Sequence, residues 1–177
     1  MRLFWAVVLP EDLRRRLAAQ GNGVRGLRQT RLDSLHLTLR FLGDIEDPEP
    51  AIAAGRRAAA EHEPFALEFQ GLGVFPQPGR ARVFWAGLGA GAEAVTALAA
   101  SLETELVAEG LAPAGRPWRG HVTLGRFRSP APVNPALLDP DEVFGTAPVD
   151  RIVLLESHLV AGGARHVPLQ ELSLLRG

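Results

Sequence analysis

The sequence predicts an α+β fold of two similar lobes, related by pseudo-twofold symmetry, with an active-site cleft between them. Two observations lead to this prediction. The tetrapeptide His-Leu-Thr-Leu at His36–Leu39 returns as His-Val-Thr-Leu at His121–Leu124. Each half of the chain also passes through strand-like and helix-like segments and carries one tetrapeptide on a strand. We therefore expect each lobe to be an antiparallel sheet with flanking helices, and residues 1–177 to form a single domain.

Hydrophobic periodicity and helix stop signals divide the first part of the chain into strands and helices. The first helix opens at Pro10 with acidic residues in its first turn and is stopped by Gly21. The second is rich in alanine, a strong helix former. The predicted strands are Leu3–Leu9, Ser34–Phe41 and Phe65–Phe69, and the predicted helices are Pro10–Gln20 and Pro48–Glu61.

The second part of the chain predicts a hairpin, a long helix and a closing pair of strands. A Pro- and Gly-containing turn at Pro76–Arg80 joins the hairpin strands Val74–Phe75 and Val83–Leu88. The proline-rich segment Pro130–Pro135 is expected to be a loop. The remaining predictions are a helix at Glu93–Glu109, a strand at Gly120–Phe127, a short helix at Leu137–Phe144, and antiparallel strands at Arg151–Val160 and His166–Leu174.

The paired tetrapeptides indicate acid–base chemistry on a phosphate ester. Alternation along a strand places His36 and Thr38 on one face, and His121 and Thr123 on one face of the other strand. Histidine exchanges protons near neutral pH, so two imidazoles facing each other can act as base and acid in one displacement. The threonine hydroxyls can donate hydrogen bonds to anionic oxygens between them. Such a pair predicts a bell-shaped pH profile centred near neutrality.

The longer motifs resemble those of a known family. Leu35–Gly43 (LHLTLRFLG) and Trp118–Arg126 (WRGHVTLGR) are similar to the two motifs of the two-histidine phosphoesterases. More narrowly they resemble the RNA 2',3'-cyclic phosphodiesterases, first named 2'-5' RNA ligases. The opening Arg2-Leu3-Phe4 and the segment Pro64–Leu88 extend the resemblance over nearly the whole chain. Trp5 departs from the pattern, which has a small or β-branched residue there.

The resemblance implies hydrolysis of 2',3'-cyclic phosphate ends of RNA to 2'-phosphomonoesters, with His36 as proton donor and His121 as proton acceptor. The residues alone leave open which histidine is the acid. The implied partners are RNA 3' ends and small cyclic nucleotides, with no metal or other cofactor, and minor 2'-5' ligation is the expected side activity. The alternative, from another functional class, is a non-catalytic nucleotide- or RNA-binding module on the same fold.

Further substrate contacts are predicted beside the motifs. Thr38 and Thr123 are expected to bind the phosphate. Arg126 lies on the opposite strand parity from His121, so a bulge is needed to turn it toward the cleft, whereas Arg40 has the correct parity. Phe41 is the aromatic residue expected to stack on a base. Phe75, Trp85 and Trp118 are further aromatic candidates for base stacking, and most of these aromatic residues are expected to belong to the core. The other histidines are expected to be structural or solvated: His62, His158 and His166.

Composition excludes several other classes of protein. The chain has no cysteine, which removes thiolate metal sites and cysteine nucleophiles, and it has no Walker, His-Glu-x-x-His or Gly-x-Ser-x-Gly motif. No apolar run approaches the length of a membrane span, and the amino terminus has the pattern of a first strand and not of a signal peptide, so we expect a cytoplasmic protein. We also expect a monomer. Net charge is −1, and all nineteen basic residues are arginine. A genome rich in G and C explains this bias, and bidentate phosphate recognition by arginine is the alternative explanation.

Overall fold

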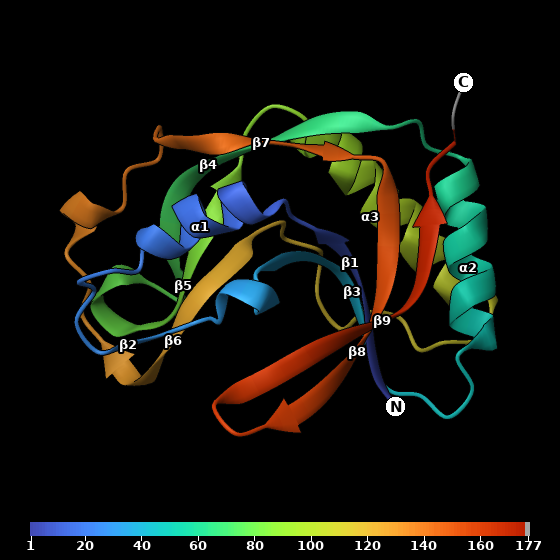
Figure 1. Ribbon diagram of the computed structural model, residues 1–177, viewed down its shortest axis with the longest axis horizontal. Helices are drawn as coiled ribbons and strands as arrows, with labels where there is room; N and C mark the ends of the chain where they lie inside the picture. Colours follow the sequence, from blue (N-terminus) through green and yellow to red (C-terminus); the bar gives the residue numbers. More distant parts are fainter. Residues whose placement is uncertain (176–177) are drawn as a thin grey trace.

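Two antiparallel sheets form the frame of the protein, and three helices pack against them (Figure 1). The computed structural model describes residues 1–175. The first sheet has the strand order β3-β1-β8-β9 and the second has the order β2-β6-β5-β4-β7. The strands are β1 (Arg2–Val8), β2 (Leu27–Gln29), β3 (His36–Asp44), β4 (Phe65–Phe75), β5 (Ala81–Leu88), β6 (Val122–Ala131), β7 (Val143–Val149), β8 (Arg151–Val160) and β9 (Gly163–Ser173). The helices are α1 (Glu11–Ala19), α2 (Glu49–Ala60) and α3 (Ala92–Ala108).

The helices divide between the two sheets. Helix α1 packs against β7 of the second sheet. Helix α2 packs against α3 and against β8 and β9, and α3 also contacts β3 and β4. The predicted architecture of two antiparallel sheets with flanking helices is confirmed. None of the helices in residues 1–175 is long and apolar enough to cross a membrane.

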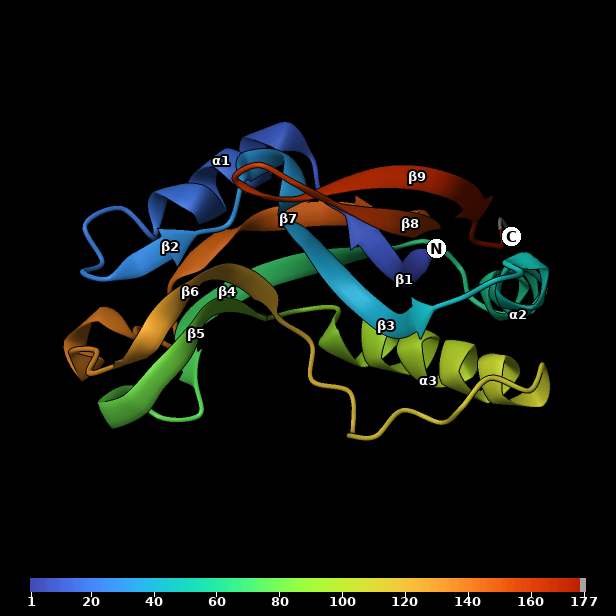
Figure 2. The same ribbon diagram turned by 90° about the horizontal axis from the view of Figure 1, so that it is seen from below.

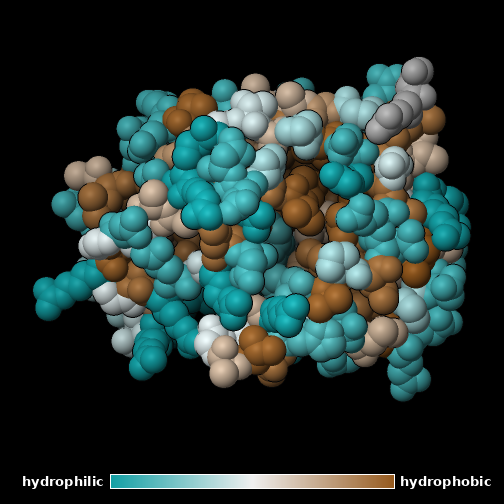
Figure 3. Space-filling model, viewed as in Figure 1, coloured by the Kyte–Doolittle hydropathy of each residue, from teal (hydrophilic) through white to brown (hydrophobic). Residues whose placement is uncertain are grey.

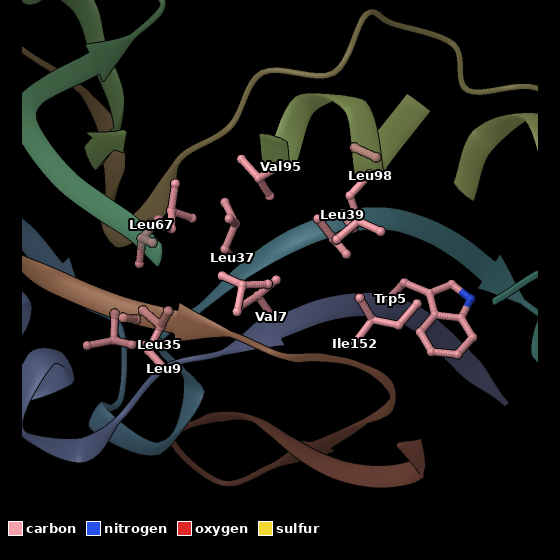
Figure 4. Close-up of a cluster of buried hydrophobic side chains, with 14 of the residues drawn as sticks. Trp5, Val7, Leu9, Leu35, Leu37, Leu39, Leu67, Val95, Leu98 and Ile152 are labelled. Atoms are coloured by element: carbon pink, nitrogen blue, oxygen red, sulfur yellow. The ribbon is translucent and has the colours of Figure 1, made fainter. Parts of the chain in front are cut away.

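Strand β1 is buried on both faces because it lies at the centre of the first sheet, between β3 and β8. Its odd-numbered residues, Trp5 and Val7 among them, enter the main hydrophobic core, where they meet Leu37 and Leu39 of β3 (Figure 4). Helix α3 covers these side chains with residues such as Leu98. The even-numbered residues form a small cluster on the opposite face of the sheet: Phe4 and Ala6 with Val153 and Leu155.

The two lobes are not the two halves of the sequence, which corrects the simple interpretation of the repeat. Strand β2 comes from the first part of the chain but pairs with β6 in the second sheet. Strands β8 and β9 come last but extend the first sheet beside β1. The chain therefore passes between the sheets four times. The strands that carry the two motifs, β3 and β6, approach each other where the sheets meet (Figure 2).

Two local predictions were wrong, and one strand was missed. The expected helix at Leu137–Phe144 is a short 3-10 turn, Pro135–Leu137, followed by strand β7. Strand β7 contains Gly145 and Pro148 and pairs only with β4, at the edge of the sheet where proline is tolerated. Strand β2 has only three residues, too few for a periodic signal. The expected loop at Pro130–Pro135 begins inside β6, which continues to Ala131.

Candidate active site

The two His-x-Thr pairs line one cleft between the sheets. His36 and Thr38 come from β3 in the first sheet, whereas His121 directly precedes β6 and Thr123 lies within it. The cleft has a volume of about 840 Å³. The space-filling view shows a face on which hydrophilic residues are interspersed with smaller groups of hydrophobic residues (Figure 3). The arrangement predicted from strand alternation, with both imidazoles and both hydroxyls at one cleft, is the arrangement found.

Each imidazole is held through the same ring nitrogen. His36 Nδ1 lies 2.7 Å from the carbonyl oxygen of Ser34, and His121 Nδ1 lies 2.7 Å from the carbonyl oxygen of Arg119. A carbonyl oxygen only accepts, so Nδ1 carries the proton in both rings and Nε2 is the nitrogen left for chemistry. His36 Nε2 is 2.9 Å from Thr38 Oγ1, whose hydroxyl donates to the neutral ring. The site therefore holds two imidazoles in the same tautomer.

Aromatic rings fix the planes of both imidazoles. His36 lies 4.9 Å from Phe4 and 5.2 Å from His166 between ring centroids, the latter edge-to-face. His121 lies 5.1 Å from Phe75, also edge-to-face, and 6.4 Å from Trp85. Phe75 and Trp85 do not line the cleft. Both are half-buried rings that pack against His121.

The backbone of each motif is tied to the segment that precedes the other motif. Trp118 Nε1 donates to the carbonyl oxygen of Thr38 at 3.0 Å. Thr30 Oγ1 donates to the carbonyl oxygen of Thr123 at 3.0 Å. The Trp118 bond joins β3 of the first sheet to the segment before β6, and the Thr30 bond holds the segment after β2 on β6 of the second sheet. Together they fix the position of one motif relative to the other.

A bulge at the leucine of each tetrapeptide changes which later side chains face the cleft. In the β1–β3 pair, Trp5 and Ala6 oppose Arg40 and Thr38, so the register skips Leu39. In the β5–β6 pair, Phe84 and Trp85 oppose Gly125 and Thr123, so the register skips Leu124. One extra residue in a strand reverses the parity of the residues that come after it.

The two bulges explain where the side chains of three predicted substrate contacts lie. Phe41 and Arg126, each five residues after a motif histidine, both line the cleft, and Phe41 is 64% exposed. Arg40, which had the correct parity for a regular strand, does not line the cleft. Its guanidinium pairs with Glu103 of α3 and donates to the carbonyl oxygens of Phe41 and Ala112. The bulge is the physical reason why Arg40 turns away from the cleft.

Burial keeps both imidazoles neutral in the free protein. The pKa of His36 falls to about 4, chiefly because burial disfavours the charged ring and secondly because His166 lies close. Burial also lowers the pKa of His121, and the nearby guanidinium groups of Arg126 and Arg119 act in the same direction. The carbonyl groups that accept the Nδ1 protons oppose both shifts.

His166 of β9 is a site residue that the sequence did not reveal. It lines the cleft, lies edge-to-face on His36, and has a buried Nδ1 atom without a hydrogen-bond partner. A lone histidine outside any motif gives no signal, and only the pairing of β8 with β1 brings β9 to the cleft. The other two histidines stay outside the cleft. His62 bonds Ser101 Oγ at 2.7 Å, and His158 lies 3.3 Å from Glu156.

No group of three or more histidine, aspartate or glutamate side chains is suitably placed to hold a metal ion within the described part of the chain. The candidate site thus consists of imidazoles, hydroxyls and guanidinium groups. These groups donate hydrogen bonds to anionic oxygens and exchange protons, which is the chemistry that acid–base phosphoryl transfer uses.

Comparison with known proteins agrees with this geometry. The model of the 2'-5' RNA ligase superfamily matches residues 10–160. The chain is 37% identical to the RNA 2',3'-cyclic phosphodiesterase of Thermus thermophilus, over 98% of this chain and 90% of the relative. A crystal structure of a Thermus thermophilus protein superposes with a TM-score of 0.82 at 33% identity, covering 98% of both chains. Escherichia coli LigT complexed with 3'-AMP superposes with a TM-score of 0.81 at 27% identity, covering 99% of this chain and 98% of that one. The chain belongs to the 2'-5' RNA ligase superfamily.

Proposed function

We propose that this protein hydrolyses the 2',3'-cyclic phosphate at RNA 3' ends to a 2'-phosphomonoester. The observation that carries the proposal is the pair of neutral, Nδ1-anchored imidazoles reaching one cleft from two different sheets. The name of the Thermus relative, RNA 2',3'-cyclic phosphodiesterase, supports the same substrate class. Adenosine 3'-phosphate bound to LigT is consistent with a site for nucleotide ends.

The reaction follows from in-line geometry. His121 Nε2 takes a proton from water as the water oxygen attacks phosphorus. The bond from phosphorus to the ribose 3'-oxygen breaks, and protonated His36 gives its Nε2 proton to that oxygen. Thr38 and Thr123 donate hydrogen bonds to the non-bridging oxygens, and the nearby Arg126 binds phosphate. With an RNA 5'-hydroxyl in place of water, the same displacement forms a 2'-5' linkage, which is the expected side reaction.

The test is turnover of a 2',3'-cyclic mononucleotide in the presence of EDTA. We expect hydrolysis without added metal, and a product that carries phosphate on the 2' position by phosphorus NMR. Binding without turnover would instead support the non-catalytic nucleotide-binding module. A predominantly 3'-phosphate product would overturn the assignment of the leaving oxygen to His36 but leave the two-histidine chemistry standing.

The pH optimum of kcat/KM is expected to lie below 6.5. This parameter reports the free enzyme, in which His121 must be neutral and His36 protonated. Activity is lost as pH falls below the lower of the two pKa values and as pH rises above the higher of them. Both pKa values lie below the ordinary histidine value of 6.5, and that of His36 is about 4. A bound phosphodiester anion raises both pKa values, so the optimum of kcat should lie at higher pH. Initial rates across the pH range measure the profile of kcat/KM at low substrate and the profile of kcat at saturating substrate.

A matched pair of variants tests the contribution of His166 to this profile. The proximity of His166 lowers the pKa of His36, so His166→Phe should move to higher pH the limb of the kcat/KM profile that the ionisation of His36 sets. His158→Phe, which removes a histidine outside the cleft on the neighbouring strand, should leave the profile in place. Identical profiles for the two variants would contradict the electrostatic role of His166.

A further inference from the structure

Three arginines form a stripe beside the candidate site. Arg28 of β2 and Arg126 of β6 are directly opposite each other in the antiparallel register. Directly opposed residues project from the same face of a sheet, with Cβ atoms about 4.5–5.5 Å apart. Arg128 lies two residues beyond Arg126 on β6, and all three residues are exposed and line the cleft. We call Arg28, Arg126 and Arg128 the arginine stripe.

The arginine stripe has no neutralising partner in the residues described. Within residues 1–175, no carboxylate is paired with any of its three guanidinium groups, whereas Arg31 nearby is paired with Asp33 at 3.1 Å. The described lining of the cleft contains five arginines and neither aspartate nor glutamate. Like charges directly opposite each other destabilise a strand pair. The chain as a whole has a net charge of −1, so this positive surface is a local arrangement and not a general excess of arginine.

We infer that Arg28 and Arg128 of the arginine stripe bind the phosphodiester groups on the 5' side of the terminal nucleotide, while Arg126 stays with the terminal phosphate. The preferred substrate is then an RNA oligonucleotide and not a cyclic mononucleotide. This inference rests on the proposed function, because it takes the terminal cyclic phosphate to lie between His36 and His121. A nucleotide whose 2' and 3' oxygens are both in the cyclic ester continues into a chain only through its 5' oxygen.

The position of the stripe along β6 fits this direction. Arg126 lies three residues beyond Thr123 and Arg128 lies five residues beyond it, about 10 Å and about 17 Å along a strand. Arg126 is thus nearest to the terminal nucleotide. Arg28, opposite it, and Arg128 lie where successive backbone phosphates would pass, and guanidinium groups bind phosphate oxygens in a bidentate manner.

The test compares binding of an RNA pentanucleotide carrying a 3'-phosphate with binding of a nucleoside 3'-phosphate. The wild-type protein should bind the pentanucleotide at least about tenfold more tightly at low salt, since each neutralised phosphate releases counterions. The double variant Arg28→Gln/Arg128→Gln should lose most of this tenfold advantage of the pentanucleotide. Its affinity for the nucleoside 3'-phosphate should fall far less. The slope of log affinity against log salt concentration for the pentanucleotide should fall by about 1.4, or about 0.7 for each arginine removed.

Arg82→Gln is the matched control. Arg82 is an exposed arginine on β5 of the same sheet and does not line the cleft. Replacing Arg82 should leave the preference for the pentanucleotide, and the slope of log affinity against log salt concentration, as in the wild type. Equal affinity for the long and short ligands, or equal losses in the double variant and in Arg82→Gln, would overturn the arginine stripe. A failure of the proposed function would be seen in a different experiment, as the absence of turnover of a cyclic mononucleotide.

Discussion

Replacing His36 or His121 by alanine is expected to lower kcat on a 2',3'-cyclic nucleotide by about 10²–10⁴, the usual contribution of a positioned acid or base. Each histidine is anchored through Nδ1, so each variant removes one Nε2 from the cleft without removing the other. Because the two groups act in the same step, the double variant should lose much less than the product of the single losses. Steady-state rates on one cyclic mononucleotide measure all three effects.

A change of leaving group separates the two roles. A phosphodiester with a p-nitrophenyl leaving group needs little protonation, so it should restore much of the rate in His36→Ala and little in His121→Ala. The reverse pattern would exchange the acid and the base. His62→Ala is the matched control, since His62 bonds Ser101 outside the cleft. Near-wild-type turnover in either active-site variant would refute the two-histidine mechanism.

The second large effect is expected at Trp5, the residue that departs from the family pattern. Its side chain is fully buried in the core and does not face the cleft, so the departure does not alter the substrate groove. Gly55 of α2 makes room for it, because a Cβ atom at Gly55 would lie 2.4 Å from Trp5 Cζ2. Trp5→Ala should lower the free energy of unfolding by about 3–5 kcal/mol. Gly55→Ala should lower it by about 1–3 kcal/mol through overpacking, although alanine favours the helix.

The pairing of Trp5 with Gly55 is tested by the double variant. Trp5→Ala/Gly55→Ala should be less destabilised than the sum of the single changes, since the added methyl group enters the space that the indole leaves. Urea unfolding of the four proteins gives the coupling energy. Arg56→Ala, an exposed change on the same helix, should be within about 0.5 kcal/mol of the wild type. Strict additivity at Trp5 and Gly55 would show that the two residues do not share this contact.

The sequence predicted the parts of the site that depend on local alternation. His36, Thr38, His121 and Thr123 face one cleft because each pair lies two residues apart on an extended segment. The bulge at Leu39 could not be predicted from the local sequence, because it depends on the register between β3 and its partner strand β1.

The rest of the cleft depends on which strands become neighbours. His166 reaches His36 only because β8 pairs with β1 and carries β9 with it. Arg28 reaches Arg126 only through the pairing of the three-residue strand β2 with β6. Hydrophobic periodicity reports which face of a strand is buried but not which strand lies beside it. The long-range pairings therefore had to come from the structure.

The passage of the chain between the sheets makes this fold suitable for a split enzyme. A cut at the exposed Ala90, between β5 and α3, would place His36 on one fragment and His121 on the other. Each sheet would then need strands from both fragments: β1 and β3 would lack β8 and β9, and β6 would lose its neighbours β2 and β5. Neither fragment could complete a sheet or a cleft by itself. Fused to two interacting proteins, the fragments would recover phosphodiesterase activity only on association, so the rate of cyclic phosphate hydrolysis would report that encounter.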